Sequence, residues 1–172
     1  MNLCPHCGAE YIEGADLCDA CQHSLTDMSF PNPKSAVEEG LLEDRIELLA
    51  PKKPLTAEVG TNVGDVLKQM VDADIGCVIV VKGDKIKGIF SERDALLKIN
   101  ANVAAHVDQP IETLMTPKPE TLDAEDKIAF ALHKMHVGGY RHIPITKNDA
   151  LLGVISIRDI LEYLAERINV SA

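Results

Sequence analysis

The stretch Gly88-Ile-Phe-Ser91-Glu-Arg93-Asp94 returns 65 residues later as Gly153-Val-Ile-Ser156-Ile-Arg158-Asp159. The surrounding segments align without a gap, and 15 of the 52 positions from 46 to 97 are identical to their partners from 111 to 162. Tandem copies that are each too small to bury their own apolar face usually form one body with a shared cleft. We therefore look for function where the two copies meet.

Each copy has the same predicted order of elements, which is helix, strand, strand and helix. Apolar residues at helical spacing predict the helices, and a turn dipeptide between two apolar runs predicts each hairpin. In the first copy we predict a helix over 62–73, strands over 75–81 and 86–90 around Gly83-Asp84, and a helix over 92–99 that begins at Ser91. In the second copy we predict helices over 125–137 and 157–168, with strands over 142–146 and 151–155 around Asn148-Asp149.

The Ser-x-x-Asp element of both copies has two interpretations. A strand that ends in Ser and enters a helix points backbone N–H groups and the positive helix end outward, which suits a phosphate. The Asp can accept two hydrogen bonds from a ribose diol, and Arg93 or Arg158 adds positive charge nearby. Alternatively, Ser-x-x-Asp is a capping box that satisfies its own helix. Two copies, each preceded by glycine, favour the ligand.

These motifs resemble the CBS domain family. The resemblance rests on Gly88-Ile-Phe-Ser91-x-x-Asp94, Gly153-Val-Ile-Ser156-x-x-Asp159, Arg141-His142-Ile143-Pro144-Ile145 and Leu114-Met115-Thr116-Pro117. It implies an α+β fold in which two βαββα units, 41–105 and 106–172, pack as one pseudo-twofold module. It also implies an adenosyl ligand in the cleft between the units, and a homodimer formed through helices such as the one that begins at Ile157.

The same resemblance implies two pockets. Each combines one unit's serine and aspartate with the opening segment of the other unit, which is 51–53 in the first unit and 116–118 in the second. The first pocket would contain Lys53, Arg141, His142, Ile155, Ser156, Arg158 and Asp159. The second pocket would contain Gly76, Ser91, Arg93, Asp94, Thr116 and Lys118. Arg141 is matched by Gly76, and Thr116 by Pro51. We therefore expect unequal sites, with tighter binding of a phosphorylated ligand at Asp159.

Four of the five cysteines lie near the amino end, as Cys4-Pro-His-Cys7 and Cys18-Asp-Ala-Cys21. Each CxxC turn brings two thiolates toward one ion, and the ten residues between the pairs suffice for a hairpin that completes a tetrahedral zinc site. A segment of about 25 residues buries too little apolar surface to fold unaided. The metal would therefore supply the folding free energy, on the order of 10 kcal/mol.

Cys4-Pro-His-Cys7-Gly8 and Cys18-x-x-Cys21 with Ser24-Leu25 resemble short zinc-ribbon domains over residues 1–26, although Gln22 stands where glycine is usual. Two disulfides or an iron site of the rubredoxin kind are alternatives, but a cytoplasmic location disfavours the first and the short spacer the second. The resemblance implies structural zinc, with His6 and His23 as exposed neighbours. The proline-containing residues 27–40 are the predicted linker.

Composition and charge restrict the partners. The net charge is −10, and residues 1–44 hold nine acidic side chains against Lys34 alone. Such a segment repels phosphate backbones, so we do not expect a nucleic-acid partner. The chain shows neither a basic and apolar leader nor an apolar run long enough to span a bilayer, which predicts a cytoplasmic protein without a membrane partner.

Several functions remain open at this point. The favoured hypothesis is a non-catalytic regulatory or sensor protein that binds AMP, ADP or ATP, with an acidic ribbon that contacts a protein partner. The alternatives are a regulator that binds S-adenosylmethionine and a zinc ribbon that binds nucleic acid. An enzyme is disfavoured, because the sequence shows no nucleophile with a paired base and no Walker loop. The fifth cysteine, Cys77, is expected to be a buried apolar residue.

Overall fold

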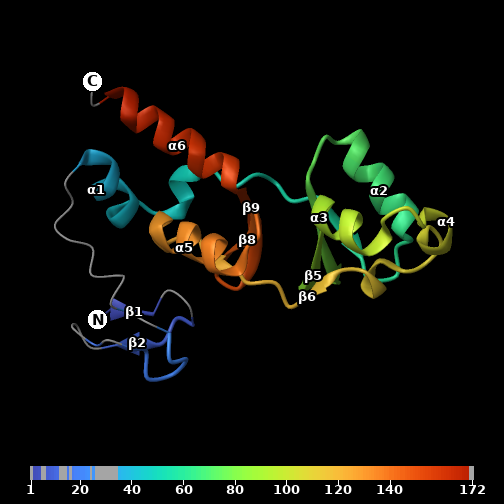
Figure 1. Ribbon diagram of the computed structural model, residues 1–172, viewed down its shortest axis with the longest axis horizontal. Coiled ribbons are helices and arrows are strands. Elements are labelled where there is room, and N and C mark those ends of the chain that lie inside the picture. The colour runs from blue at the N-terminus through green and yellow to red at the C-terminus, as the bar shows by residue number, and fades with distance from the viewer. Residues whose placement is uncertain are drawn as a thin grey trace. The chain divides into compact units, whose positions relative to one another are not determined.

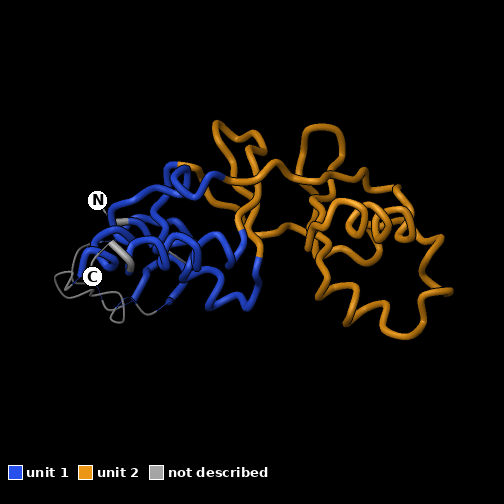
Figure 2. Tube along the Cα trace, turned by 90° about the horizontal axis from the view of Figure 1, so that it is seen from above, with its two compact units in different colours: residues 1–50, 125–141, 156–172 blue, residues 51–124, 142–155 orange. Residues whose placement is uncertain are grey.

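The computed structural model describes residues 2–4, 7–11, 15, 17–23, 25 and 35–170. The chain forms two compact units (Figure 2): unit 1 holds residues 1–50, 125–141 and 156–172, and unit 2 holds residues 51–124 and 142–155. His6 and residues 27–34 of the predicted linker lie outside the described residues. None of the described helices is long and apolar enough to cross a bilayer.

In unit 2 the first copy and one strand of the second copy build a sheet with the strand order β3-β4-β5-β6 (Figure 1). The strands are β3 Thr56–Glu58, β4 Cys77–Lys82, β5 Lys85–Ser91 and β6 Thr116–Pro117. β3 runs parallel to β4, and β4 and β5 form the predicted antiparallel hairpin. Helix α2, Val63–Asp72, buries Val63 and Val66 in one apolar core with Phe90 of β5.

The helix predicted over 92–99 has two parts. Helix α3, Glu92–Asp94, begins at Ser91, whose Oγ accepts a hydrogen bond from the N–H of Asp94. The chain then widens into a π-helical turn, η3, at Ala95–Ile99. Helix α4, Val103–His106, and the 3-10 turn η4, Ile111–Thr113, lead to β6. The sequence did not predict α4 or η4, because such short segments carry no apolar period.

The second copy repeats this order. Its strands are β7 Leu122–Asp123, β8 His142–Lys147 and β9 Ala150–Ser156, and its helices are α5 Ile128–Gly138 and α6 Ile157–Val170. Asn148 and Asp149 have φ angles of 51° and 62°, which suits the predicted two-residue hairpin turn. Because β3 and β7 precede α2 and α5, each copy has the order βαββα. The predicted α+β fold is confirmed.

The opening segment of each copy pairs with the last strand of the other copy. β6 of the second copy pairs antiparallel with β5 at Gly88, and Lys52 of the first copy exchanges two backbone hydrogen bonds of 2.9 and 3.0 Å with Val154 of β9. The repeated glycine permits this approach. A Cβ at Gly88 would lie 2.9 Å from the carbonyl oxygen of Thr116, and one at Gly153 would lie 2.9 Å from that of Lys52.

The two copies also share apolar contacts within unit 2. Ile79 and Ile89 of the first copy form a buried cluster with Cys77, and Leu151 and Val154 of the second copy pack against it. This shared core agrees with the expectation that neither copy buries its apolar face alone.

Unit 1 brings together segments that are distant in sequence. Helix α1, Ala36–Glu43, and the 3-10 turn η2, Ile46–Leu49, lie beside α5 and α6 (Figure 1). The Oδ2 of Asp44 accepts a hydrogen bond from the Tyr163 hydroxyl, at 2.7 Å, and another from the Arg167 guanidinium. The predicted linker up to residue 40 therefore ends in a helix. The signal was Ser35, whose Oγ caps the N–H of Glu38.

At the amino end, β1 Asn2–Leu3 and β2 Glu10–Tyr11 form a short antiparallel pair. They flank the first CxxC turn, Cys4 to Cys7. The small buried cluster here contains Cys4, Cys18 and Leu25.

Candidate functional site

The carboxylate of Asp94 lies where β5 meets α3, and the residue is only 9% exposed. Its Oδ2 accepts hydrogen bonds from the backbone N–H of Ser91, at 2.9 Å, and from the Ser91 hydroxyl, at 2.6 Å. Its Oδ1 accepts a hydrogen bond of 2.8 Å from the hydroxyl of Thr116. The structure thus brings together three of the predicted residues of this site, two from the first copy and one from the second.

A fourth side chain, Lys98, completes this cluster. Its Nζ lies 2.7 Å from Oδ1 of Asp94, 2.7 Å from the carbonyl oxygen of Leu114 and 3.3 Å from Oγ1 of Thr116. Lys98 was not among the predicted site residues. Its spacing of four residues from Asp94, on the predicted helix, was the sequence signal that could have found it.

These contacts control the charge of Asp94. Burial on its own would raise the pKa of the carboxyl, but hydrogen bonds from Lys98, Ser91 and Thr116 outweigh burial and lower the pKa below its ordinary value. Asp94 is therefore ionised at neutral pH, and its negative charge lies 2.7 Å from the ammonium group of Lys98, whose side chain is 36% exposed.

The second copy forms the same bonds at the start of α6. Asp159 is 6% exposed, and its Oδ2 accepts hydrogen bonds from the N–H and the hydroxyl of Ser156, at 2.5 and 2.7 Å. In both copies the aspartate caps its own helix, as the structural interpretation of Ser-x-x-Asp requires. The ligand interpretation of the same residues stays a prediction.

The other predicted site residues differ in exposure. Gly76 faces the imidazole of His142, and a Cβ at Gly76 would lie 3.2 Å from Nε2 of that ring. A side chain at this position would therefore require His142 or Glu92 to shift slightly. Ile155 is fully buried. The predicted cations are exposed, namely Lys53, Arg93, Lys118, Arg141 and Arg158.

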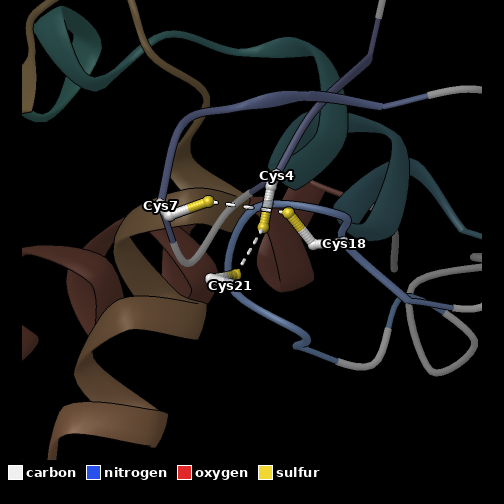
Figure 3. Close-up of side chains that lie close together, drawn as sticks. All are labelled: Cys4, Cys7, Cys18 and Cys21. Carbon is white, nitrogen blue, oxygen red and sulfur yellow. Dashed lines mark hydrogen bonds between the residues drawn. The ribbon is translucent and has the colours of Figure 1, made fainter.

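The four amino-terminal cysteines form a second candidate site (Figure 3), in which all four Sγ atoms lie within 4.8 Å of one another. Cys4 and Cys21 approach to 3.7 Å, and Cys7 and Cys18 to 3.6 Å. Four sulfurs around zinc, each bonded at about 2.3 Å, lie about 3.8 Å apart. The donor set therefore fits a tetrahedral zinc ion. The structure contains no disulfide among these cysteines, since a disulfide would require two sulfurs about 2.05 Å apart.

The two CxxC turns share one backbone geometry. The N–H of Gly8 donates to the carbonyl oxygen of Cys4, at 2.7 Å, and the N–H of Gln22 donates to that of Cys18, at 2.8 Å. Gln22 has a φ of 58°, close to the 73° of Gly8. The unusual residue therefore keeps the left-handed conformation that glycine adopts most easily.

Hydrogen bonding and burial shift the pKa values of two thiols in this cluster in opposite directions. A backbone hydrogen bond from Cys21 lowers the pKa of the Cys18 thiol to about 7. Burial raises the pKa of the Cys21 thiol to about 12. A bound cation would favour the thiolate form of both.

His23 and Cys77 are both at least partly shielded from solvent, which was expected for Cys77 only. His23 is half-buried and not exposed as predicted, because its Nε2 lies 3.2 Å from Nε2 of His133 on α5. Cys77 is buried as predicted, and burial raises the pKa of its thiol to about 12, which leaves it protonated.

Comparison with known proteins places this arrangement in a family. The model described as CBS domain matches residues 47–101 and 111–166, which is more than half of the chain. The chain belongs to the CBS domain family. Its two CBS domains correspond to the two copies of the repeat, and the Ser-x-x-Asp element lies within each match.

The chain is similar to curated proteins from other organisms. YlbB of Bacillus subtilis is 33% identical over 110 residues, which cover 63% of this chain and 72% of that protein. The CBS domain-containing protein CBSCBSPB1 of Arabidopsis thaliana is 33% identical over 96 residues, or 56% of this chain. This match spans only 17% of the length of the plant protein.

Solved structures have the same fold. A CBS-domain containing protein from Agrobacterium tumefaciens superimposes with a TM-score of 0.63 at 24% identity, over 69% of this chain and 94% of that one. A CBS domain protein from Pyrobaculum aerophilum, complexed with AMP, superimposes with a TM-score of 0.60 at 26% identity, over 71% of this chain and 98% of that one.

Proposed function

We propose that the chain is a non-catalytic regulatory protein that binds an adenine nucleotide, AMP, ADP or ATP, through its paired CBS domains. The observation that carries this proposal is the buried, ionised Asp94 between Ser91 of its own domain and Thr116 of the other. A ligand held there contacts both domains, so its binding energy can favour one arrangement of the pair. The relative complexed with AMP supports an adenosyl ligand.

The two proposed sites differ in their cations. Asp94 would bind the ribose, with Gly76, Arg93 and Lys118 nearby. Asp159 would bind the ribose in the other site, whose further residues are Lys53, Arg141, His142, Ile155, Ser156 and Arg158. Lys98 is bonded to Asp94 itself, and apart from it the second set holds one more cation, so we expect the second site to bind a phosphorylated ligand more tightly.

Separate substitutions of the two aspartates test this proposal. Calorimetry with AMP, ADP, ATP and S-adenosylmethionine should show a larger loss of affinity in Asp159→Ala than in Asp94→Ala. Asp72→Ala is the control, because Asp72 is an exposed aspartate at the end of α2. Equal losses would contradict unequal sites.

A thermal-shift panel over the same compounds identifies the ligand class. A ligand at 100 times its dissociation constant adds about 2.7 kcal/mol of stability. If no adenosyl compound raises the melting temperature, the proposed function is wrong.

We further propose that Cys4, Cys7, Cys18 and Cys21 hold one structural zinc ion, and that this ribbon contacts a protein partner. Metal analysis of the purified protein should find about one zinc per chain, by the chemistry of a closed four-thiolate site. Cys18→Ser should lose it, whereas the matched control Cys77→Ser should keep it. Zinc retained in Cys18→Ser would count against the site.

The homodimer, the cytoplasmic location and the domain limits stay predictions. Leu161 and Ile168 of α6 are 56% and 59% exposed, which is apolar surface that a second copy could cover. Light scattering after size-exclusion chromatography measures the dimer. Binding of DNA or RNA at moderate salt would instead revive the nucleic-acid function.

A further inference from the structure

The ammonium group of Lys98 is fully engaged inside the Asp94 site. It donates to Oδ1 of Asp94 and to the carbonyl oxygen of Leu114, both at 2.7 Å, and to Oγ1 of Thr116 at 3.3 Å. An ammonium group has three N–H donors, and these contacts use all three. In this arrangement Lys98 has no hydrogen left for a phosphate.

A ribose diol would need the same carboxylate oxygen. Ser91 directs both of its hydrogen bonds to Oδ2 of Asp94, whereas Thr116 and Lys98 bind Oδ1. A diol that donates to Oδ1 therefore competes with an ammonium ion. Both contacts use the ionised carboxylate, but the ammonium group adds a full positive charge 2.7 Å from Oδ1 and a hydroxyl adds none, so the competition favours Lys98.

The second copy does not offer these donors. The position of Lys98 is occupied by Tyr163, whose hydroxyl donates to Asp44, and the position of Thr116 is occupied by Pro51. The two copies therefore carry different residues at the two positions that contact Oδ1 in the first copy.

We propose that Lys98 is an internal competitor of the ribose diol and sets the specificity of the Asp94 site. Lys98 thereby weakens the binding of ligands whose affinity depends on a hydrogen bond from the ribose diol to Asp94. This inference rests on the proposed nucleotide function, because it concerns the same aspartate. It predicts that neutralising Lys98 strengthens diol binding, whereas a lysine that serves as a phosphate ligand would give the opposite result.

The test uses the full chain with Asp159→Ala, so that only the Asp94 site remains. Calorimetry compares this protein with the double variant Asp159→Ala/Lys98→Met. Adenosine is the probe, since it carries the diol but no charge, and 2′,3′-dideoxyadenosine lacks the diol. Lys98→Met should tighten adenosine about tenfold, the scale of one charge-assisted bond, and leave dideoxyadenosine unchanged.

Lys85→Met in the same background is the matched control, because it removes an exposed lysine at the start of β5 and should change neither affinity. Lys98→Gln is the second variant, in case the methionine disturbs folding, and should also tighten adenosine. Unchanged or weaker adenosine binding, or an equal gain for dideoxyadenosine, overturns the inference. A different result would reject the proposed nucleotide function but not the role of Lys98. In that result AMP does not bind the wild type, whereas adenosine binds the Lys98 variant.

Discussion

At the scale of single residues, Asp94 uses its two carboxylate oxygens for two different contacts. Oδ2 completes the cap of the helix that follows β5, and Oδ1 joins the first CBS domain to the opening segment of the second through Thr116. A single ionised group thus holds a helix start and a contact between domains. Its charge should contribute to stability as well as to ligand binding.

We expect a pH-dependent stability that Asp94→Asn removes. The pKa of Asp94 is lower in the folded chain than its ordinary value, so the ionised form stabilises the fold. This contribution is complete above the unfolded pKa, about 3.9, and is lost as the pH falls through the folded pKa. Urea unfolding should show the difference between wild type and variant shrinking as the pH falls from 6 to 3. A difference between wild type and variant that is independent of pH would contradict the prediction.

The sequence predicted part of this cluster. Ser91, Asp94 and Thr116 were predicted because their motifs recur, and the structure brings them together. Lys98 could not be found by comparing the copies, because Tyr163 replaces it in the second copy and has a different partner. Comparing two copies of a repeat finds the residues that both copies share, but it does not find a side chain that has a role in one copy only.

At the scale of elements, the predicted long helices and strands are present, and the missed ones are short. β6 and β7 have two residues each, too few to show an alternating pattern. Each exists because a distant strand supplies its hydrogen bonds, as β5 does for β6. Helix α1 was missed because the prolines before it indicated a linker, and the cap at Ser35 follows directly after them.

We predict that Gly88→Ala destabilises the pairing of β5 with β6. The added Cβ would collide with the Met115 side chain and would lie 2.9 Å from the backbone oxygen of Thr116. Overpacking of this kind costs about 1–3 kcal/mol. Gly60→Ala is the control, since a Cβ there meets nothing within 4 Å. Urea unfolding measures both variants, and equal stability of Gly88→Ala and wild type would argue against a close strand contact in solution.

At the scale of the whole molecule, compact units do not follow the order of the sequence. Unit 1 is assembled from three separate stretches, and its Tyr163–Asp44 hydrogen bond joins residues 119 positions apart. Burial, followed by the contact with Asp44, raises the pKa of Tyr163 to about 12, so the hydroxyl remains a donor at neutral pH. The segment before the first CBS domain is thereby fastened to the last helix of the chain.

Tyr163→Phe should lower the free energy of unfolding by about 1 kcal/mol, the usual net value of one hydrogen bond. For a chain of this size that corresponds to a fall in melting temperature of about 2–4 °C. The same substitution in an Asp44→Ala background should have a smaller effect, because its partner is already gone. Calorimetric scans of the four proteins give the coupling, and equal effects in both backgrounds would show that the bond contributes nothing.

The exchange of opening segments has a consequence for the history of the chain. Without β6, the strand β5 has an open edge at Gly88, and without Lys52 the strand β9 has one at Val154. A protein that held one copy alone could close this edge with the opening segment of a second molecule, in a strand-swapped dimer. Gene duplication and fusion convert that exchange between molecules into one within a single chain. The two aspartate sites could then acquire different neighbours, such as Lys98 and Tyr163, which a symmetric dimer of identical copies cannot do.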